Sequence, residues 1–148
     1  MQQNKPDGVT PSQTVGPFYE IGLCRRDASV LAAGGTPLRG RLLDGEGAPV
    51  DGLVELWDGT RLARSGTDGD GGFAFVVDPS APYLDAVVFA RGLLRHQFTR
   101  IYLTDADDPL LASLDEAQRA TLLARREGDG LRFDIHLQGE QETVFLAL

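Results

Sequence analysis

The feature that most constrains the fold is a series of short apolar runs separated by turns rich in glycine, aspartate and proline. Runs of this length between such turns are typical of strands rather than helices. In 132–139 the apolar residues alternate with polar ones, as in a strand with one buried face. The segments that predict strands and their turns are 38–50, 51–59, 67–78, 81–103, 132–139 and 143–148. The pattern predicts a mainly β fold, a sandwich or barrel of short, mostly antiparallel strands.

One short helix is expected near residues 114–126. Ser113 and Glu116 have the spacing of a capping box, and Arg125 and Arg126 would complement the helix dipole in the last turn. A glycine at 128 or 130 can take the left-handed conformation that ends a helix. We interpret this helix as part of the scaffold.

Residues 1–23 form an extended N-terminal arm in this interpretation, because Pro11 and Pro17 favour an extended path and no helix or strand period is visible. The arm carries apolar side chains, including Phe18 and Tyr19, that should not remain in water. It is therefore expected to dock, either on its own sandwich or on another chain.

The composition fits one domain spanning residues 1–148, since this length is sufficient for one core. The net charge of -8 argues against nucleic-acid binding, and no apolar stretch is long enough to cross a membrane. Cys24 is the single cysteine, which suits a reducing compartment, and the N-terminus lacks the apolar core of a secretion signal. We expect a soluble, cytoplasmic protein.

The residues that could carry chemistry are few. His96 and His136 lie in different predicted strands without metal-ligand spacing, and the carboxylates fall mostly in turns. Arg91 stands where a strand enters a tight turn. Its side chain can simply extend into solvent, or it can be a fixed guanidinium that binds a carboxylate with two hydrogen bonds. The sequence alone describes a β scaffold without a self-contained catalytic centre.

Four segments together resemble the alpha subunits of protocatechuate 3,4-dioxygenase, a family of intradiol ring-cleaving dioxygenases. They are "TPSQTVGPFYEIGL" (10–23), "VELW" (54–57), "VVFARGLLRHQFTRIYL" (87–103) and "RFDIHLQGEQETVFLAL" (132–148). The resemblance implies a β-sandwich and a higher-order hetero-oligomer with a homologous beta subunit. In that assembly the beta subunit holds Fe(III), and the complex cleaves protocatechuate with O2 to 3-carboxy-cis,cis-muconate. The pathway implied is aromatic catabolism through β-ketoadipate.

The resemblance also implies that this chain does not hold the iron. Alignment with catalytic relatives places Tyr83 and Asp85 where those relatives carry a His-x-His pair of iron ligands. The segments 58–70 and 77–83, which carry tyrosine ligands in the relatives, are compressed here. We therefore assign no catalytic residue and no metal ligand to this chain.

What the resemblance does assign is a share of the substrate pocket at the interface between the two subunits. Thr14, Gly16 and Pro17 in the arm, with Arg91, match alpha-chain residues that line that pocket. Two alternatives stay open: a degenerate sandwich that acts as a binding or structural module, and an independent dioxygenase built on Tyr83, Asp85 and a histidine.

Overall fold

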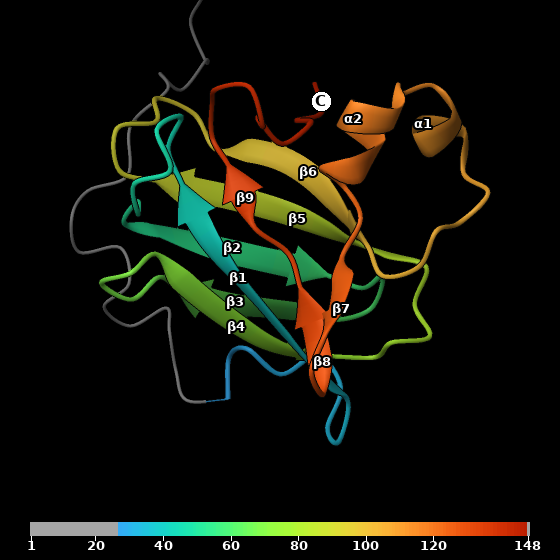
Figure 1. Ribbon diagram of the computed structural model, residues 1–148. Coiled ribbons are helices and arrows are strands. Elements are labelled where there is room, and N and C mark those ends of the chain that lie inside the picture. Colours follow the sequence, from blue (N-terminus) through green and yellow to red (C-terminus); the bar gives the residue numbers. More distant parts are fainter. Residues whose placement is uncertain (1–26, 148) are drawn as a thin grey trace, which may run out of the picture.

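The computed structural model describes residues 27–147, which form two β-sheets packed face to face (Figure 1). The first sheet has the order β4-β1-β8-β7, and β9 pairs with the far end of β1. Its strands are β1 (Thr36–Leu43), β4 (Gly72–Val77), β7 (Arg125–Glu127), β8 (Gly130–Arg132) and β9 (Ile135–His136). The second sheet has the order β3-β2-β5-β6. Its strands are β2 (Gly52–Trp57), β3 (Leu62–Gly66), β5 (Tyr83–Ala90) and β6 (Gln97–Tyr102). The predicted β-sandwich is thus confirmed.

The pairing is antiparallel except where the C-terminal part of the chain returns to β1. Leu38 and Arg39 pair in parallel with Leu131 and Arg132 of β8, and Leu42 pairs with Ile135 of β9. In Figure 1 this orange and red segment runs alongside β1. One edge of β1, near the start of the described chain, therefore pairs with residues about ninety positions later.

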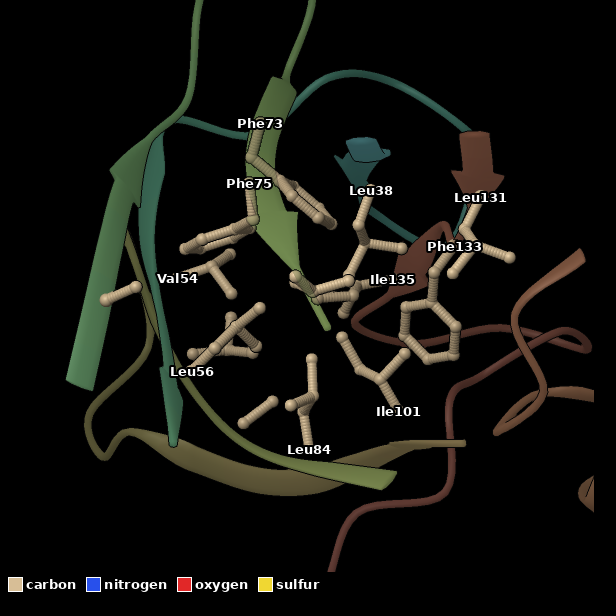
Figure 2. Packing of buried hydrophobic residues seen from close by; sticks show 14 of the residues in the cluster. Leu38, Val54, Leu56, Phe73, Phe75, Leu84, Ile101, Leu131, Phe133 and Ile135 are labelled. Atoms are coloured by element: carbon tan, nitrogen blue, oxygen red, sulfur yellow. The ribbon is translucent and has the colours of Figure 1, made fainter. Parts of the chain in front are cut away.

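Buried and outward-facing residues alternate along the strands, and the buried ones form the core between the two sheets (Figure 2). In β5 the even-numbered residues are buried and the odd-numbered ones face outward, which is the period expected for a strand with one buried face. The main buried side chains come from both sheets: Leu38, Leu42, Val54, Leu56, Phe73, Phe75, Leu84, Val88, Ile101, Phe133 and Ile135. Gly40 allows β1 to pack closely against its neighbours in the same sheet, since a Cβ there would collide with the Phe133 carbonyl oxygen and the Phe73 ring.

The turns are built by aspartates, as expected for turn residues of this type. Asp44, Asp58, Asp68 and Asp78 each accept a backbone N–H from two residues further along the chain. Of the two segments that the resemblance indicates as compressed, 58–70 contains two turns and the strand β3, and 77–83 contains a short link from β4 to β5. Asp58 begins the turn into β3, a strand that the sequence analysis does not predict, and Asp78 begins the link from β4 to β5.

The helical region is shorter than predicted. It consists of α1 (Pro109–Ala112) and α2 (Glu116–Ala120), and the capping box of α2 is formed by Asp115 and Gln118 rather than by Ser113 and Glu116. After Thr121 the backbone pairs with β6, because Tyr102 donates to the Leu122 carbonyl and Ala124 donates to the Tyr102 carbonyl. This pairing extends the chain, so the prediction of Arg125 and Arg126 in the last helical turn is wrong: they belong to β7. None of the described helices is long and apolar enough to cross a membrane.

The prediction of a C-terminal strand at 143–148 is also wrong for the residues that the structure describes. Only Leu146 forms a bridge, to Phe98 of β6. The segment is held by side chains as well as by the backbone. Thr99 donates its hydroxyl to the Val144 carbonyl, and the Thr143 hydroxyl accepts the His136 backbone N–H, while Thr143 and Leu146 donate their backbone N–H groups to His136 and Phe98.

Candidate functional site

Arg91 follows the last residue of β5 and begins the turn to β6. Its backbone N–H donates to the Asp51 carbonyl at 2.9 Å, which ties the turn to the start of β2. Gly92 has a φ of 92°, a conformation that favours glycine, so the chain turns directly after the arginine. The Arg91 side chain is exposed and makes no ion pair with another residue of the described chain. The backbone is thus fixed while the guanidinium faces solvent.

The other three predicted pocket residues, Thr14, Gly16 and Pro17, lie outside the described residues. The structure therefore places Arg91 alone among the four. His96 lies near it in the same turn, between the rings of Phe89 and Phe98, with centroid distances of 5.4 and 4.8 Å. His136 lies on the other sheet in β9.

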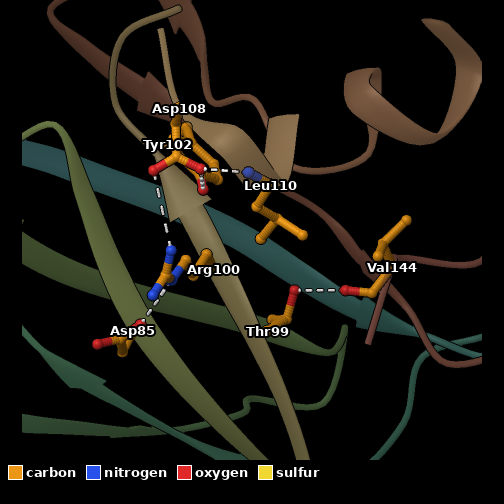
Figure 3. A network of polar contacts seen from close by, with 7 residues as sticks. All are labelled: Asp85, Thr99, Arg100, Tyr102, Asp108, Leu110 and Val144. Atoms are coloured by element: carbon orange, nitrogen blue, oxygen red, sulfur yellow. Dashed lines mark hydrogen bonds and ion pairs between the residues drawn. The ribbon is translucent and has the colours of Figure 1, made fainter. Parts of the chain in front are cut away.

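The opposite end of the β5–β6 hairpin holds a polar cluster, which we call the Arg100 cluster. It consists of Tyr83 and of four residues shown in Figure 3: Asp85, Arg100, Tyr102 and Asp108. Antiparallel register sets Asp85 opposite Arg100 and Tyr83 opposite Tyr102. The Arg100 Nε donates to Asp85 at 3.0 Å, and its Nη1 lies 3.9 Å from an Asp108 oxygen. The guanidinium also lies 4.2 Å from the centroid of the Tyr83 ring. One cation therefore contacts three neighbours.

Tyr102 and Asp108 connect this cluster to the helices. The Tyr102 hydroxyl donates to Asp108 at 2.8 Å, and Asp108 caps α1 by accepting the Leu110 backbone N–H at 2.9 Å. The Tyr102 ring is fully buried with Leu111 and Leu122 in a second apolar cluster. The Arg100 cluster thus anchors both the sheet end and the start of α1.

The electrostatics favour the ionised form of Asp108 and the protonated forms of Tyr102 and Arg100. The hydrogen bond from Tyr102 lowers the pKa of Asp108, helped by backbone donors of α1 and by Arg100. Burial raises the pKa of Tyr102, so its hydroxyl stays protonated and continues to donate. The pKa of Arg100 is raised by hydrogen bonding to Tyr102 and then by Asp85. The result is a neutral phenol between a cation and an anion.

These residues do not fit an Fe(III) site. Asp85 already pairs with the Arg100 guanidinium at 3.0 Å, and the same guanidinium lies over the Tyr83 ring, so a fixed positive charge beside both groups opposes a ferric ion there. Between residues 27 and 147, no three His, Cys, Asp or Glu side chains are grouped so that they could hold a metal ion. The possibility of an independent iron site on Tyr83 and Asp85 is therefore not supported by this geometry.

Sequence reasoning noted Tyr83 and Asp85 but missed their partners Arg100, Tyr102 and Asp108. A partial signal was present, because a hairpin register centred on Gly92 and Leu93 sets Asp85 opposite Arg100. Asp108 could not be found in this way, because it lies beyond the hairpin and reaches the cluster only through the fold.

Comparison with known proteins agrees with the fold and specifies the family. No protein-family model matches the chain. The protocatechuate 3,4-dioxygenase alpha chain of Burkholderia cepacia is 34% identical, covering 92% of this chain and 95% of that protein. The alpha chain of Pseudomonas putida is also 34% identical, covering 92% and 94%. The first alignment runs over 188 positions, more than the 148 residues of this chain, so the relatives contain segments that this chain lacks.

Among solved structures, the dioxygenase domain of a dioxygenase carbohydrate-binding protein fusion from Streptomyces sp. SirexAA-E is similar in fold, with a TM-score of 0.52 and 23% identity. The match covers 88% of this chain and 98% of that domain. The identity to the two curated relatives over nearly their whole length shows that the chain belongs to the family of protocatechuate 3,4-dioxygenase alpha chains.

Proposed function

We propose that this chain is a non-iron-binding alpha subunit that completes the substrate pocket of an Fe(III)-bearing beta subunit. The complex would carry out the intradiol, O2-dependent cleavage of protocatechuate to 3-carboxy-cis,cis-muconate. Family membership supports the enzyme class. The observation that carries the role of this chain is the contrast between Arg91, whose guanidinium is exposed, and Tyr83 and Asp85, which Arg100 engages.

Arg91 is suited to bind an anionic aromatic acid. Its backbone is held by Asp51 and its side chain has no ionic partner among the described residues, so two parallel N–H donors are available to a carboxylate. In the proposed pocket it would pair with the substrate carboxylate or with a catecholate oxygen. Such a contact orients the ring and offsets its charge, and it requires no proton transfer by this chain.

The remaining parts of the pocket come from the arm and from the partner. Thr14, Gly16 and Pro17 would line it on the side of this chain, since a Gly-Pro pair lets a flat ring approach closely. The iron would be held by the beta subunit, where it would bind the catecholate and raise its reactivity toward oxygen. We also propose that the assembly is a cytoplasmic hetero-oligomer with several copies of both subunits.

The test is to prepare the chain alone and together with a protocatechuate 3,4-dioxygenase beta chain from the same organism. We expect the chain alone to contain no stoichiometric iron and to be inactive, and the purified complex to contain iron and cleave protocatechuate. Iron bound by the isolated chain at one ion per chain would contradict the proposal. A chain that forms a defined homo-oligomer and ignores the beta chain would instead favour the alternative, a non-catalytic binding or structural module.

A further inference from the structure

The outer face of the second sheet carries an apolar patch beside the Arg91 turn, which we call the turn-end patch: Leu53, Val87, Phe89 and Phe98. Antiparallel register sets Leu53 opposite Phe89 and Val87 opposite Phe98. Register partners on neighbouring strands point to the same face. Val54, the neighbour of Leu53 on β2, points into the core (Figure 2), so the members of the patch point outward.

Exposure to water differs between the two ends of this outer face. At the turn end, Leu53 is only 3% exposed and the other members of the turn-end patch are half-buried. At the other end, Trp57 and Leu62 are register partners on β2 and β3 and are 42% and 48% exposed. Neither apolar cluster of the described chain includes a member of the turn-end patch. The patch is therefore shielded from water where no core of the described chain covers it.

The surroundings of the turn-end patch suit an apolar, aromatic occupant. Glu55 lies next to the patch on β2, and its carboxylate already pairs with Arg64 of β3. The His96 ring lies 5.4 Å from the Phe89 ring and 4.8 Å from the Phe98 ring, measured between centroids. This row of rings offers edges and faces to further aromatic side chains. The patch thus provides ring packing rather than a charged contact.

The described chain begins at the edge of the same sheet. Arg64 of β3 donates its backbone N–H to the Ala28 carbonyl at 2.7 Å, and the Arg61 guanidinium donates to the Leu31 carbonyl at 3.2 Å. Because β3 is the outermost strand of the second sheet, residues 27–31 lie along its free edge. Residues 1–26 are therefore attached at an edge of the face that carries the turn-end patch.

The N-terminal arm is long enough to reach the turn-end patch. Neighbouring strands lie about 4.8 Å apart, so β5 lies roughly 14 Å from Ala28, about three strand spacings away. An extended chain covers about 3.3 Å per residue, so Leu23 can lie up to about 13 Å from Asp27 and Phe18 up to about 30 Å. A segment tethered this close meets the patch at a high effective concentration, which favours it over a free partner.

We infer that residues 10–23 dock on the turn-end patch of the same chain, with Phe18 and Tyr19 packed against its aromatic rings. The apolar and aromatic side chains of this segment match the patch in chemistry. A docked segment also accounts for the low exposure of Leu53, and it leaves Trp57 and Leu62 exposed at the far end of the face.

The docked arm deepens the proposed function and rests on it for one step. Arg91 directly follows β5 at the turn end of the face. An arm docked there would bring Thr14, Gly16 and Pro17 beside Arg91, since these residues directly precede Phe18 and its neighbours. The share of the substrate pocket on this chain would then be assembled before the beta chain binds.

The test is a cross-linking measurement on the full chain, in which Cys24→Ser removes the single native thiol. Glu20→Cys places one thiol in the arm without removing an apolar side chain, and His96→Cys places the other beside the patch at an exposed position. The matched control combines Glu20→Cys with Leu62→Cys, at the exposed far end of the same face. A short bismaleimide should link the first pair within one chain at least about tenfold faster than the second.

Leu62 lies on β3, where the described chain begins, so an undocked arm would link to this position at least as fast. Equal rates for the two pairs would therefore overturn the inference. Phe18→Ser/Tyr19→Ser should abolish the preference for position 96. The control Trp57→Ser/Leu94→Ser, which removes two exposed apolar side chains outside the patch, should keep it. Cross-links between two chains in place of links within one would assign the arm to a second copy and overturn the inference.

This measurement uses neither a beta chain nor activity, so its failure is distinct from a failure of the proposed function. An arm that does not dock on its own chain can still line the substrate pocket from the beta chain. Iron content and activity of the complex test the proposed function, and the cross-linking rates of the chain alone test the docking of the arm.

Discussion

The two ends of the β5–β6 hairpin use arginine in opposite ways. At the Tyr83 end, Arg100 contacts Asp85, Asp108 and the Tyr83 ring. At the turn, Arg91 is held only by its backbone, and its side chain is exposed. One hairpin therefore contains two arginines with different roles. Arg100 is structural, and Arg91 is available to a ligand. Changes at the first end should affect stability, and changes at the second should affect activity.

The largest effect should come from Tyr102, which is fully buried at the Arg100 end. Tyr102→Ala removes a large ring packed against Leu111 and Leu122, and it should lower the free energy of unfolding by about 3–5 kcal/mol. Denaturant titration of the purified chain measures this. As a control, Tyr102→Phe keeps the ring and loses only the hydrogen bond to Asp108, which should cost about 1 kcal/mol. If the two variants were equally destabilised, packing of the ring would not be the main contribution.

The second-largest effect should be on activity, and it concerns Arg91 at the turn of the hairpin. Arg91→Ala, studied in the complex with the beta chain, should lower kcat/KM for protocatechuate by roughly 10- to 100-fold, which corresponds to the loss of a charge-assisted pair. Denaturation of the variant chain should match the wild type, since the Arg91 backbone hydrogen bond to Asp51 is retained. Arg95→Ala is the control, because Arg95 is an exposed arginine in the same turn. Unchanged kinetics in Arg91→Ala would remove this residue from the pocket.

A smaller change in stability should follow from Arg100→Gln. The substitution leaves Asp85 without its cation, but this carboxylate is half exposed, so water compensates for much of the loss. We expect a decrease of about 1 kcal/mol in the free energy of unfolding, the upper range for exposed pairs. Arg100→Lys keeps the charge but not the planar group over Tyr83, and it should recover only part of the loss. Full recovery by lysine would mean that the stacking contributes nothing.

The smallest effect should be the contribution of Asp108 to the pH dependence of the free energy of unfolding. Its pKa in the folded chain lies below the ordinary value of 3.8, chiefly because Tyr102 donates to it. The folded state therefore favours the ionised form, so this contribution is fully present above pH 3.8 and is lost as the pH falls through the lowered pKa. Asp108→Asn should be less stable than the wild type at neutral pH, and the gap should narrow in acid.

Unfolding curves of both proteins across this pH range measure that gap. Asp58 and Asp78 also have lowered pKa values, and their effect cancels in the difference between the two proteins. A gap that stays constant with pH would show that Asp108 does not contribute through its charge.

The strands of the second sheet could largely be predicted from sequence, because alternation and turn residues are local signals. The segments 51–59 and 81–103 contain β2, β5 and β6. The helical region is less predictable from the sequence. The capping box begins at Asp115 rather than at Ser113, and backbone pairing of Leu122 and Ala124 with β6 ends the helix before Arg125 and Arg126. Tertiary pairing overrode local preference there.

The functional residues also differ in whether a local sequence signal indicates them. Arg91 could be indicated by a local motif, since it ends one strand and precedes a glycine. The contact between Arg39 and Arg132 could not be predicted, because these residues become neighbours only through the parallel pairing of β1 with β8. A sequence contains no local signal for a contact that spans so many residues.

That parallel pairing has a consequence for how the protein is made. During synthesis, β1 emerges early and can pair with β4 on one side, but its other edge stays open until residues 130–136 have left the ribosome. An open strand edge is a template for pairing with other chains. The nascent protein therefore passes through a stage in which the first sheet is incomplete, and a chain that stops before β8 should aggregate rather than wait in a native-like form.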